Sequence, residues 1–454
     1  MEDVVIIGAG IAGLSLARAL RASGVAATVL EAGPVAGGRI ASVQAGGYLL
    51  ERGPAGFVDD APEVRALIDG LALGPRVLRS SELVRRRFIA LDGRLVPAPT
   101  SPLDFARSAL LPPWARARAL LDLVLPTGPA ARGEDETAGA LVRRRLGQLV
   151  AERLVAPFAS GQFGGDLDAL SAASTFPSLV AFERERGSLI AGALAKWRTD
   201  RRAPPALGTH MTFAGGMQEL TDALAKDLGP ALRLGVRVEA LAREGSRWRV
   251  TLSEGGAARE LVASSVVLTQ PAFAAAPLVA PLDPPLSRAL CAIPYSPVAV
   301  LHLAWRRGDV PHPLDGYGFL APLDSALRTM GVVFTSQVYA SRAPQGMALF
   351  LARFGGARRP EDAALPDDAL VALARADLKA TLGIAAPPVL ARVFRWERGL
   401  AQYTVGHRER VAEVDAAERR WAGLYFAGNG YRGLALTECI KDAARLAPRI
   451  AARL

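Results

Sequence analysis

Cysteine, histidine and unbroken apolar runs are all scarce in this chain of 454 residues. The two cysteines, Cys291 and Cys439, are too few for a disulfide framework and suit a reducing compartment, so we expect a cytoplasmic location. The four histidines show no spacing with cysteine that is typical of a metal site, and we expect no metal. Two uncharged stretches, 262–282 and 290–305, are interrupted by prolines, which predicts buried strands and loops rather than membrane spans. A strand pattern starts almost at the first residue, so we expect no signal peptide.

Lysine is rare as well, because only four of the 54 basic residues are lysines. The net charge is +10, but the arginines are scattered rather than gathered into a stripe. This distribution argues against nucleic acid as a partner and favours acidic small molecules or anionic lipid surfaces. The chain is too long for one ordinary domain, so we expect two or three domains with sizeable apolar cores.

The residues near the N-terminus have the order of a dinucleotide-binding unit. An apolar run at 4–7 predicts a buried parallel strand. Gly8, Gly10 and Gly13 then complete a G-x-G-x-x-G pattern at the start of a predicted helix, where the glycines permit a tight turn, a close approach of pyrophosphate and close helix packing. A second apolar run ends on Glu31, whose carboxylate can accept hydrogen bonds from a ribose. The motif alone does not distinguish NAD from FAD.

Two further segments distinguish between these cofactors. Gly37-Gly38-Arg39 follows Glu31 by a short loop, and the run 421–429 has the pattern of a buried strand that ends in glycine before a helix. Taken alone, these segments would be an ordinary turn and an ordinary final strand–helix unit. Together with the N-terminal pattern, they resemble the amine-oxidase-like flavoproteins, in which a Gly-Gly-Arg segment wraps the FAD pyrophosphate and a C-terminal helix points its N-terminus at the flavin.

The resemblance implies a split site for non-covalent FAD. A strand pattern at 236–238 corresponds to the strand that contacts adenine in these flavoproteins. Cys439 lies close to the flavin motif, but a small buried residue is a simpler interpretation than a covalent attachment point. The residues that the resemblance assigns to the cofactor are Gly8, Ala9, Gly10, Ile11, Ala12, Gly13, Glu31, Ala32, Gly38, Arg39, Gly53, Pro54, Ala55, Gly56, Val238, Trp396, Gly428, Asn429, Leu434, Ala435 and Leu436.

Longer stretches narrow the resemblance to the family of oxygen-dependent protoporphyrinogen oxidases. It implies the six-electron oxidation of protoporphyrinogen IX to protoporphyrin IX in haem synthesis, with FAD as the cofactor, dioxygen as the oxidant and hydrogen peroxide as a product. The flavin supplies the chemistry, and we identify no catalytic acid or base. We interpret His210, His302, His312 and His407 as structural. The stretches that carry the resemblance lie at 87–95, 161–166, 170–180, 316–320, 402–407, 428–433 and 438–440.

Three alternatives stay open. A coproporphyrinogen III oxidase would share the fold, the cofactor and the reaction, but its substrate carries four propionates instead of two. Another FAD amine oxidase or desaturase would need an aromatic cage or a long apolar tunnel. A non-catalytic binding protein on the same fold would bind no flavin.

The resemblance also assigns residues to the substrate. Arg87 matches an arginine that pairs with a propionate, which suits a guanidinium that stays charged and binds a carboxylate bidentately. Without the resemblance, Arg87 would be interpreted as part of a solvated basic run. The other matches, to residues that face the tetrapyrrole through backbone or apolar groups, are Gly165, Tyr317, Leu320 and Val333.

The chain departs from the family at Arg353, where an apolar or aromatic residue is usual, and Phe354 stands next to it. If Arg353 points into the substrate site, it adds a cation that would favour coproporphyrinogen. If it points away, Phe354 takes the packing role. Thr437 and Glu438 also differ from the Asn-Asp of the family, which affects the surroundings of the flavin.

We predict an α/β (α+β) fold with a Rossmann-like FAD-binding domain, a mixed-sheet substrate-binding domain and an inserted helical domain. The FAD-binding domain is discontinuous. Its segments are 1–80, 208–272 and 403–454, those of the substrate-binding domain are 81–95 and 273–402, and the helical domain is 96–207.

One predicted helix of the insert has an apolar face. Because core-facing helices are much the commoner kind, we expect this face to pack within its own domain. The alternative is peripheral contact with the cytoplasmic face of the inner membrane, with arginines on lipid phosphates. A homodimer is also left open. The face comprises Trp114, Ala117, Leu121, Val124 and Leu125, with Arg116 opposite it and Arg118 at its edge.

Overall fold

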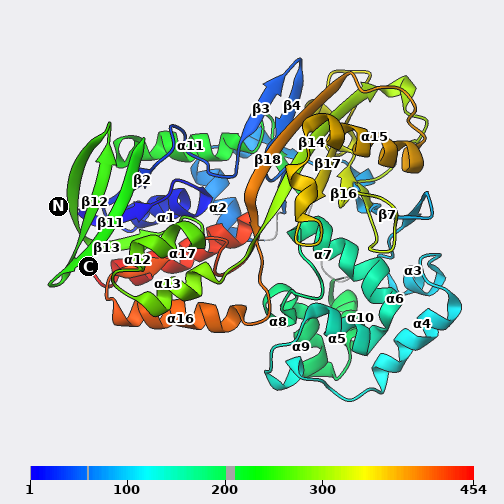
Figure 1. Cartoon of the computed structure of the whole chain (residues 1–454), viewed down its shortest axis with the longest axis horizontal. Coiled ribbons are helices and arrows are strands. Elements are labelled where there is room, and N and C mark those ends of the chain that lie inside the picture. Colours follow the sequence, from blue (N-terminus) through cyan, green and yellow to red (C-terminus); the bar gives the residue numbers. More distant parts are fainter. Residues whose placement is uncertain (1, 59–60, 201–209) are drawn as a thin grey trace.

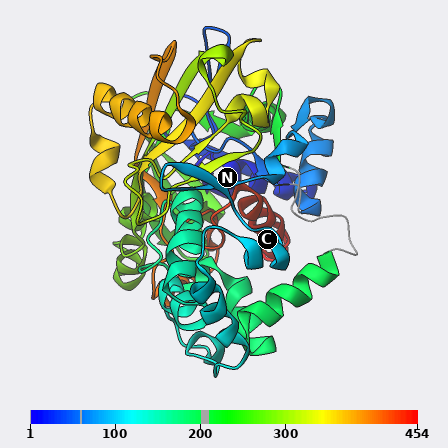
Figure 2. The ribbon, with the colours of Figure 1, turned by 90° about the vertical axis from the view of Figure 1, so that its right-hand side faces the viewer.

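The structure, a computed structural model, describes residues 2–58, 61–200 and 210–454. Figure 1 shows three parts, namely a sheet enclosed by helices, a second sheet with a long helix against it, and a group of helices below the second sheet. The helical part again lies below the second sheet in the perpendicular view of Figure 2. The predicted boundary at 207/208 lies outside the described residues.

The first sheet forms because its strands carry apolar residues on both faces, as expected of buried parallel strands. In β1 (Glu2–Ile7), Val4 and Ile6 face one helical layer, while Val5 and Ile7 face the other. The strand order is β10-β2-β1-β13-β12-β11, and β19 pairs with β13. The other strands are β2 (Ala27–Glu31), β10 (Leu232–Leu234), β11 (Val236–Glu244), β12 (Arg247–Glu254), β13 (Ala257–Leu268) and β19 (Leu424–Phe426).

Helices cover both faces of the first sheet. Four helices share a core with Val4, and three others share a core with Val5. The first group is α1 (Ile11–Ala22), α2 (Pro62–Gly70), α11 (Gln218–Leu228) and α17 (Leu436–Ala451). The second group is α12 (Ala272–Val279), α13 (Pro284–Cys291) and α16 (His407–Arg420).

The second sheet is mixed and has two unlike faces. Its order is β18-β14-β17-β16-β15-β7-β8, and only β15 and β7 pair in parallel among its described strands. One face buries aromatic side chains against α15 (Asp367–Leu382). The strands are β7 (Phe88–Leu91), β8 (Arg94–Pro97), β14 (Tyr295–Arg306), β15 (Gly318–Leu320), β16 (Gly331–Val333), β17 (Met347–Gly355) and β18 (Leu390–Ala401), and the short α14 (Thr335–Val338) follows β16.

Two strands and two small sheets join the first part to the second. Figure 1 shows β18 running from the first part to the far end of the second sheet, antiparallel to β14. The hairpin of β3 (Ser42–Ala45) and β4 (Tyr48–Glu51) packs Tyr48 and Leu50 on the second sheet. The other small sheet has the order β5-β9-β6, with β5 (Phe57–Val58), β6 (Val77–Arg79) and β9 (His210–Phe213).

The helical part is inserted after β8. A π-helical turn, Ala151–Val155, joins α6 to α7. The helices are α3 (Pro102–Arg107), α4 (Pro113–Leu120), α5 (Ala138–Leu146), α6 (Gln148–Val150), α7 (Ala156–Phe163), α8 (Ala172–Thr175), α9 (Pro177–Arg186) and α10 (Leu189–Asp200).

The apolar face around α4 does not pack within its own part, and that expectation is wrong. Trp114 is 64% exposed, Val124 is 80% exposed and Leu121 is also exposed. The helix instead turns Ala115 and Ala119 into the core of the helical part. Their short side chains let the helix approach its neighbours closely, so the bulky residues are left outside.

The structure confirms the predicted fold class. The first part is a Rossmann-like unit built from separate N-terminal, middle and C-terminal stretches, and the mixed second sheet and the helical part are inserted between them. Among the described residues, no helix combines the length and apolar character that crossing a membrane would need.

Candidate active site

The glycine turn after β1 has one glycine that is tightly packed and one that borders open space. A Cβ on Gly13 would lie 2.0 Å from the carbonyl oxygen of Gly8, so only glycine lets α1 approach the turn this closely. Gly8 itself has a φ of 111°, and its carbonyl accepts a hydrogen bond from the Thr269 hydroxyl at 2.9 Å. A Cβ on Gly10 would meet no atom within 4 Å. The free space beside Gly10 at the N-terminus of α1 is therefore suited to a pyrophosphate.

Glu31, at the end of β2, lies against this turn. Its Oε2 accepts a hydrogen bond from the Ala9 backbone N–H at 2.8 Å, and its Oε1 accepts one from Gly33 N–H at 2.8 Å. These contacts fix the direction of the carboxylate while leaving further lone pairs on both oxygens. Glu31 can therefore accept hydrogen bonds from a ribose next to the turn. Ala32 follows it on the same loop.

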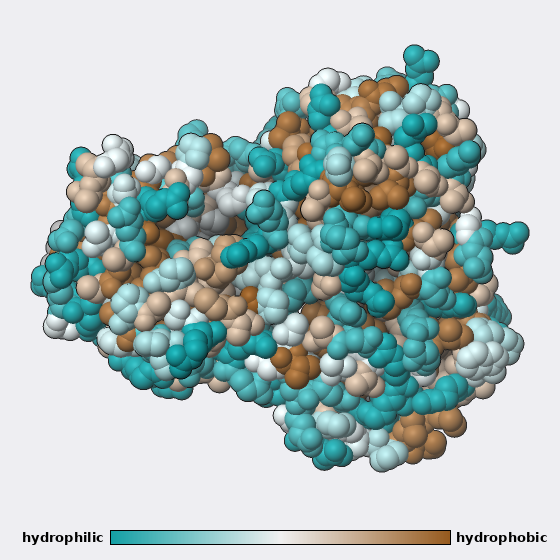
Figure 3. Space-filling view, in the orientation of Figure 1, coloured by the Kyte–Doolittle hydropathy of each residue, from teal (hydrophilic) through white to brown (hydrophobic). Residues whose placement is uncertain are grey.

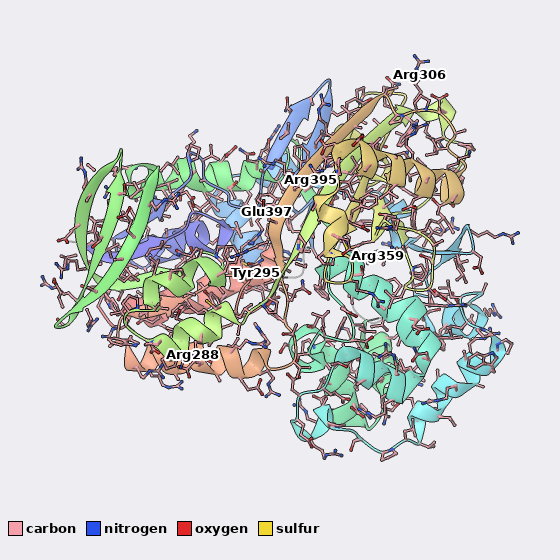
Figure 4. All side chains as sticks on the ribbon, in the orientation of Figure 1. Arg288, Tyr295, Arg306, Arg359, Arg395 and Glu397 are labelled. Atoms are coloured by element: carbon pink, nitrogen blue, oxygen red, sulfur yellow. The ribbon has the colours of Figure 1, made fainter. Side chains whose placement is uncertain are left out.

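The Gly-Gly-Arg segment crosses over the glycine turn. The Gly37 N–H donates to the Ala9 carbonyl at 2.8 Å, and a Cβ on Gly38 would come within 3.3 Å of the Gly10 Cα. The Arg39 guanidinium donates to the Arg398 carbonyl at 2.7 Å. It also lies 5.7 Å from the ring of Tyr295, which Figure 4 shows where β14 leaves the first part. Burial lowers the pKa of Arg39.

The segment 53–56 runs between the two sheets. A Cβ on Gly53 would lie 2.0 Å from the Arg39 carbonyl oxygen, and one on Gly56 would lie 2.5 Å from the Met211 carbonyl oxygen. The Trp396 indole N–H donates to the Arg52 carbonyl at 2.6 Å, which brings β18 to this segment. Pro54 and Ala55 lie between these fixed points, and Ala55 packs against the second sheet.

The C-terminal segment returns to α1 from the other end of the chain. Gly428 has a φ of 110°, and a Cβ on it would lie 3.7 Å from that of Ala12. The Tyr403 hydroxyl donates to the Asn429 carbonyl at 3.0 Å. Helix α17 then begins without a side-chain cap, so its first N–H groups are free for a ligand. Ile11 lies in the first turn of α1, and Leu434, Ala435 and Leu436 lead into α17.

Val238 stands apart from this group, in a strand that pairs with β12 rather than with β2. It packs in the second core of the first part, beside an irregularity between Val238 and Ala240. Its predicted contact with adenine stays a prediction. Burial raises the pKa of the Cys439 thiol to about 12, so this cysteine is a neutral thiol and not a nucleophilic thiolate. A neutral Cys439 thiol is consistent with FAD that is bound without a covalent link.

The register of β17 decides which way Arg353 and Phe354 point. Arg353 is paired with Val300 on one side and with Gly331 on the other. Because side chains alternate along a strand, Leu351 and Arg353 lie on the same face. Val298, Val300, Val333 and Leu351 form an apolar cluster on this face, together with Ala55 and Tyr317, and we call it the inner face.

Phe354 lies on the opposite side and is fully buried among the aromatic residues under α15. It therefore does not reach the inner face, which corrects its assignment to the substrate. The physical reason is that successive side chains of a strand point to opposite faces, so Phe354 cannot lie on the same face as Arg353.

Arg87 reaches the edge of the inner face. Its guanidinium donates to His210 Nε2 at 2.8 Å and lies 5.3 Å from the centre of the Tyr317 ring. His210 and Tyr317 are themselves 5.3 Å apart. Burial, helped by the nearby positive charge of Arg87, lowers the pKa of His210 to about 4. A neutral His210 thus accepts the hydrogen bond and positions the arginine, a role that the sequence did not indicate because His210 comes from a distant strand.

Gly165 and Leu320 lie where the second sheet meets the helical part. A Cβ on Gly165 would lie 2.6 Å from Leu170 Cδ1 and 3.0 Å from Gln402 Oε1. Leu320 fills the space beside Gly161 of α7, because a Cβ there would lie 2.3 Å from Leu320 Cδ2. These two residues therefore border the inner face from the side of the helices.

The arrangement has the parts of a flavin site facing an apolar surface. Backbone groups of the first part can hold a dinucleotide, and the inner face carries aliphatic side chains with Arg87 and Arg353. Among the described residues, no three His, Cys, Asp or Glu side chains come together as a metal site would require.

Comparisons with known proteins agree with this geometry. Residues 11–451 match the model of the family described as flavin containing amine oxidoreductase. The chain is 30% identical to the chloroplastic protoporphyrinogen oxidase of Nicotiana tabacum, over 99% of this chain and 85% of the other. It is also 30% identical to the coproporphyrinogen III oxidase of Bacillus subtilis (strain 168), over 97% and 96% of the two chains.

The crystal structure of a protein from Exiguobacterium sp. 255-15, assigned as a protoporphyrinogen oxidase, covers 100% of this chain and 99% of its own with a TM-score of 0.83 and 26% identity. The residues around the glycine turn fit the cofactor of this family, since the open space beside Gly10 and the uncapped helix ends suit FAD. The chain therefore belongs to the family of flavin-containing amine oxidoreductases, and it is an FAD-dependent oxidoreductase.

Proposed function

We propose that the chain oxidises a porphyrinogen, and the two candidates are protoporphyrinogen IX and coproporphyrinogen III. Six electrons and six protons leave the substrate, and three molecules of dioxygen take them up as hydrogen peroxide. One observation carries the proposal: the Arg87 guanidinium is positioned by His210 and Tyr317 at the edge of an apolar face. Among the described residues no carboxylate pairs with Arg87. A propionate of the substrate would therefore be the anionic partner of this guanidinium.

The bound FAD supplies the hydride acceptor, and the side chains bind and orient. Arg87 would hold a propionate bidentately. Tyr317 and Val333 would lie against the apolar macrocycle and keep water from it, while Leu320 and Gly165 would close the side toward the helices. A neutral His210 keeps Arg87 in place without competing for the propionate, since it carries no negative charge.

An anaerobic reduction experiment tests the proposal. The purified yellow protein is mixed without oxygen with protoporphyrinogen IX or with coproporphyrinogen III, and the flavin absorbance is followed. Loss of the flavin absorbance with either substrate, and its return with peroxide release when oxygen is admitted, is the expected result. A flavin that neither porphyrinogen reduces would overturn the proposal.

An amine oxidase or a desaturase is the competing activity. An amine oxidase would need an aromatic cage around a cation, and a desaturase would need a long apolar tunnel. The inner face carries two arginines beside its apolar residues, and these cations would repel an amine and attract carboxylates. Benzylamine or putrescine that reduced the flavin faster than a porphyrinogen would favour the amine oxidase.

The helical part supports a further proposal, peripheral contact with the cytoplasmic face of the inner membrane. Figure 3 shows apolar side chains at the lower right edge of the molecule. Arg116 and Arg118 donate to backbone carbonyls, so the proposal rests on the apolar side chains and not on these arginines. Ala117 is exposed and Leu125 is half-buried. The exposed large apolar residues of this patch are Leu103, Trp114, Leu120, Leu121, Leu123 and Val124.

Co-sedimentation with vesicles of anionic phospholipid tests the membrane proposal. We expect the wild-type protein to sediment with the vesicles and the double variant Trp114→Ser, Val124→Ser to stay in solution. A wild-type protein that stays in solution would contradict it. If the protein instead sediments as a dimer in analytical ultracentrifugation and the double variant is monomeric, the patch is a homodimer interface.

A further inference from the structure

Arg353 lies deep in the molecule without a partner. Its side chain is half-buried, and its Nε is fully covered and makes no hydrogen bond. Among the described residues, no carboxylate forms an ion pair with it. The phenol of Tyr317 is the one neighbour that favours its charged form, whereas burial lowers the pKa of Arg353.

A covered arginine without an anion is unusual. An arginine does not lose its proton in a protein, so it cannot escape the cost of desolvation by becoming neutral. Buried charges are therefore normally paired. Here no described residue provides an anion, and the position of Arg353 on the inner face means that a bound ligand would supply it.

The neighbours of Arg353 in the sheet are small or apolar and carry no charge. Val300 and Gly331 flank it in the sheet, and the Leu320 side chain lies against Gly331, where a Cβ would be 3.0 Å from Leu320 Cδ2. Leu320 is paired with Gly331 on the next strand, so Arg353, Gly331 and Leu320 form one row across three strands. On the far side of this row, Leu320 pairs with Ile89 of β7, and Arg87 directly precedes that strand.

Arg87 and Arg353 are too far apart to share one carboxylate. Three strand spacings separate β17 from β7, which is roughly 14 Å. This distance is comparable with the width of a tetrapyrrole. The two propionates of protoporphyrinogen IX lie next to each other on one edge of the macrocycle, whereas coproporphyrinogen III carries a propionate on each of its four rings.

We propose that Arg353 binds a propionate on the edge of the macrocycle opposite the one that Arg87 holds, and that it makes a tetracarboxylate porphyrinogen the preferred substrate. This inference rests on the proposed function, because it assigns a carboxylate of the porphyrinogen to Arg353. It makes Arg353 a specificity-determining residue. The hydride transfer itself does not depend on it.

The test compares the two porphyrinogens on four proteins: wild type, Arg353→Met, Arg353→Lys and the control Arg306→Met. Arg306 is exposed at the outer end of β14, at the edge of the same sheet in Figure 4. The rate of anaerobic flavin reduction is measured over a range of substrate concentrations. A second readout is the affinity of the oxidised protein for coproporphyrin III, from quenching of porphyrin fluorescence.

We expect wild type to prefer coproporphyrinogen III. In Arg353→Met the ratio of kcat/KM for coproporphyrinogen to that for protoporphyrinogen should fall by about tenfold to a hundredfold, the range for losing one charge-assisted partner of a carboxylate. The affinity for coproporphyrin III should fall in parallel. Arg353→Lys should keep part of the preference, and Arg306→Met should keep all of it.

An unchanged ratio in Arg353→Met would overturn the inference, and so would a loss of bound FAD with no change in the ratio, because Arg353 would then serve the cofactor. A wild-type flavin that neither porphyrinogen reduces would overturn the proposed function instead. The two failures are therefore distinguishable.

Discussion

Two arginines lie in the interior of different parts of this molecule, and only one of them has partners. Arg145, in α5 of the helical part, has a side chain that is 0% exposed and pairs with the equally buried Asp122. Its other N–H groups donate to the carbonyls of Leu125, Pro126 and Gly187. Arg353, in the second sheet, has no such partner among the residues that the structure describes.

The difference separates a structural role from a ligand-binding one. The partners of Arg145 offset the loss of water and hold the loop 121–126 against α9 and α10, since Asp122 also accepts hydrogen bonds from Ser188 and Ile190. For Arg353 no described residue offsets the loss of water. We therefore expect removal of the two arginines to have opposite effects on the stability of the ligand-free protein.

Arg145→Met should have the largest effect. It would leave Asp122 as an unpaired carboxylate in a dry core, which lowers the free energy of unfolding by about 3–5 kcal/mol. Chemical denaturation followed by circular dichroism measures this loss. The matched control is Arg143→Met, two residues away, whose ion pair with Asp168 is partly exposed and should be worth no more than about 1 kcal/mol. Equal losses in both variants would contradict the structural role of Arg145.

Arg353→Leu should act in the other direction. Replacing an unpaired, half-buried cation by an apolar side chain should raise the free energy of unfolding by about 1–3 kcal/mol, although the preference for coproporphyrinogen is lost. The same denaturation experiment, carried out with FAD in excess and without substrate, provides the measurement. If this variant is less stable than wild type, Arg353 has a structural partner and the contrast with Arg145 fails.

The glycine turn offers the same contrast between filled and open space. Gly10→Ala should leave the flavin-free fold unchanged, since its φ of −76° suits alanine and its Cβ would touch nothing. The new methyl group would occupy the place of the pyrophosphate, so FAD should bind at least about tenfold more weakly, or about 1.4 kcal/mol.

The ratio of flavin to protein absorbance after dialysis measures this loss. Gly74→Ala, another glycine whose Cβ would meet no atom within 4 Å, is the control and should keep its FAD. Undiminished FAD in Gly10→Ala would show that the pyrophosphate lies elsewhere.

The two sites also differ in how far the sequence could predict them. The cofactor site follows from local order, because Gly8, Gly13 and Glu31 belong to one strand–helix–strand unit whose backbone makes the site. The inner face is assembled from strands that are far apart in the sequence. Arg353 and Phe354 occupy adjacent positions, and only the pairing of β17 with β14 and β16 decides which of them faces inward.

Two other features depended on contacts that no local pattern reveals. The apolar residues around α4 suggested a core-facing helix, yet Ala115 and Ala119 make the contact and Trp114 stays outside. His210 was interpreted as a structural residue, and its contact with Arg87 depends on β9 pairing with β5 and β6. In both cases tertiary packing decided the role of the side chain.

The smallest predicted effect concerns the other arginine of the inner face. Arg87→Met should raise the pKa of His210 from about 4 toward its ordinary value, but only in part, because burial is the larger cause of its low pKa and Arg87 the smaller. Since the folded pKa lies below that of the unfolded chain, His210 contributes stability in full above about pH 6.5, and this contribution is lost as the pH falls toward 4. The variant should therefore lose less stability than wild type between pH 7 and pH 5. Titration of the histidine resonances by NMR checks the prediction directly. His407, whose pKa burial also lowers to about 4 but without a contribution from Arg87, is the internal control. A pKa of His210 that does not move would mean that Arg87 exerts no field on it, and that the positioning of the arginine by a neutral histidine is wrong.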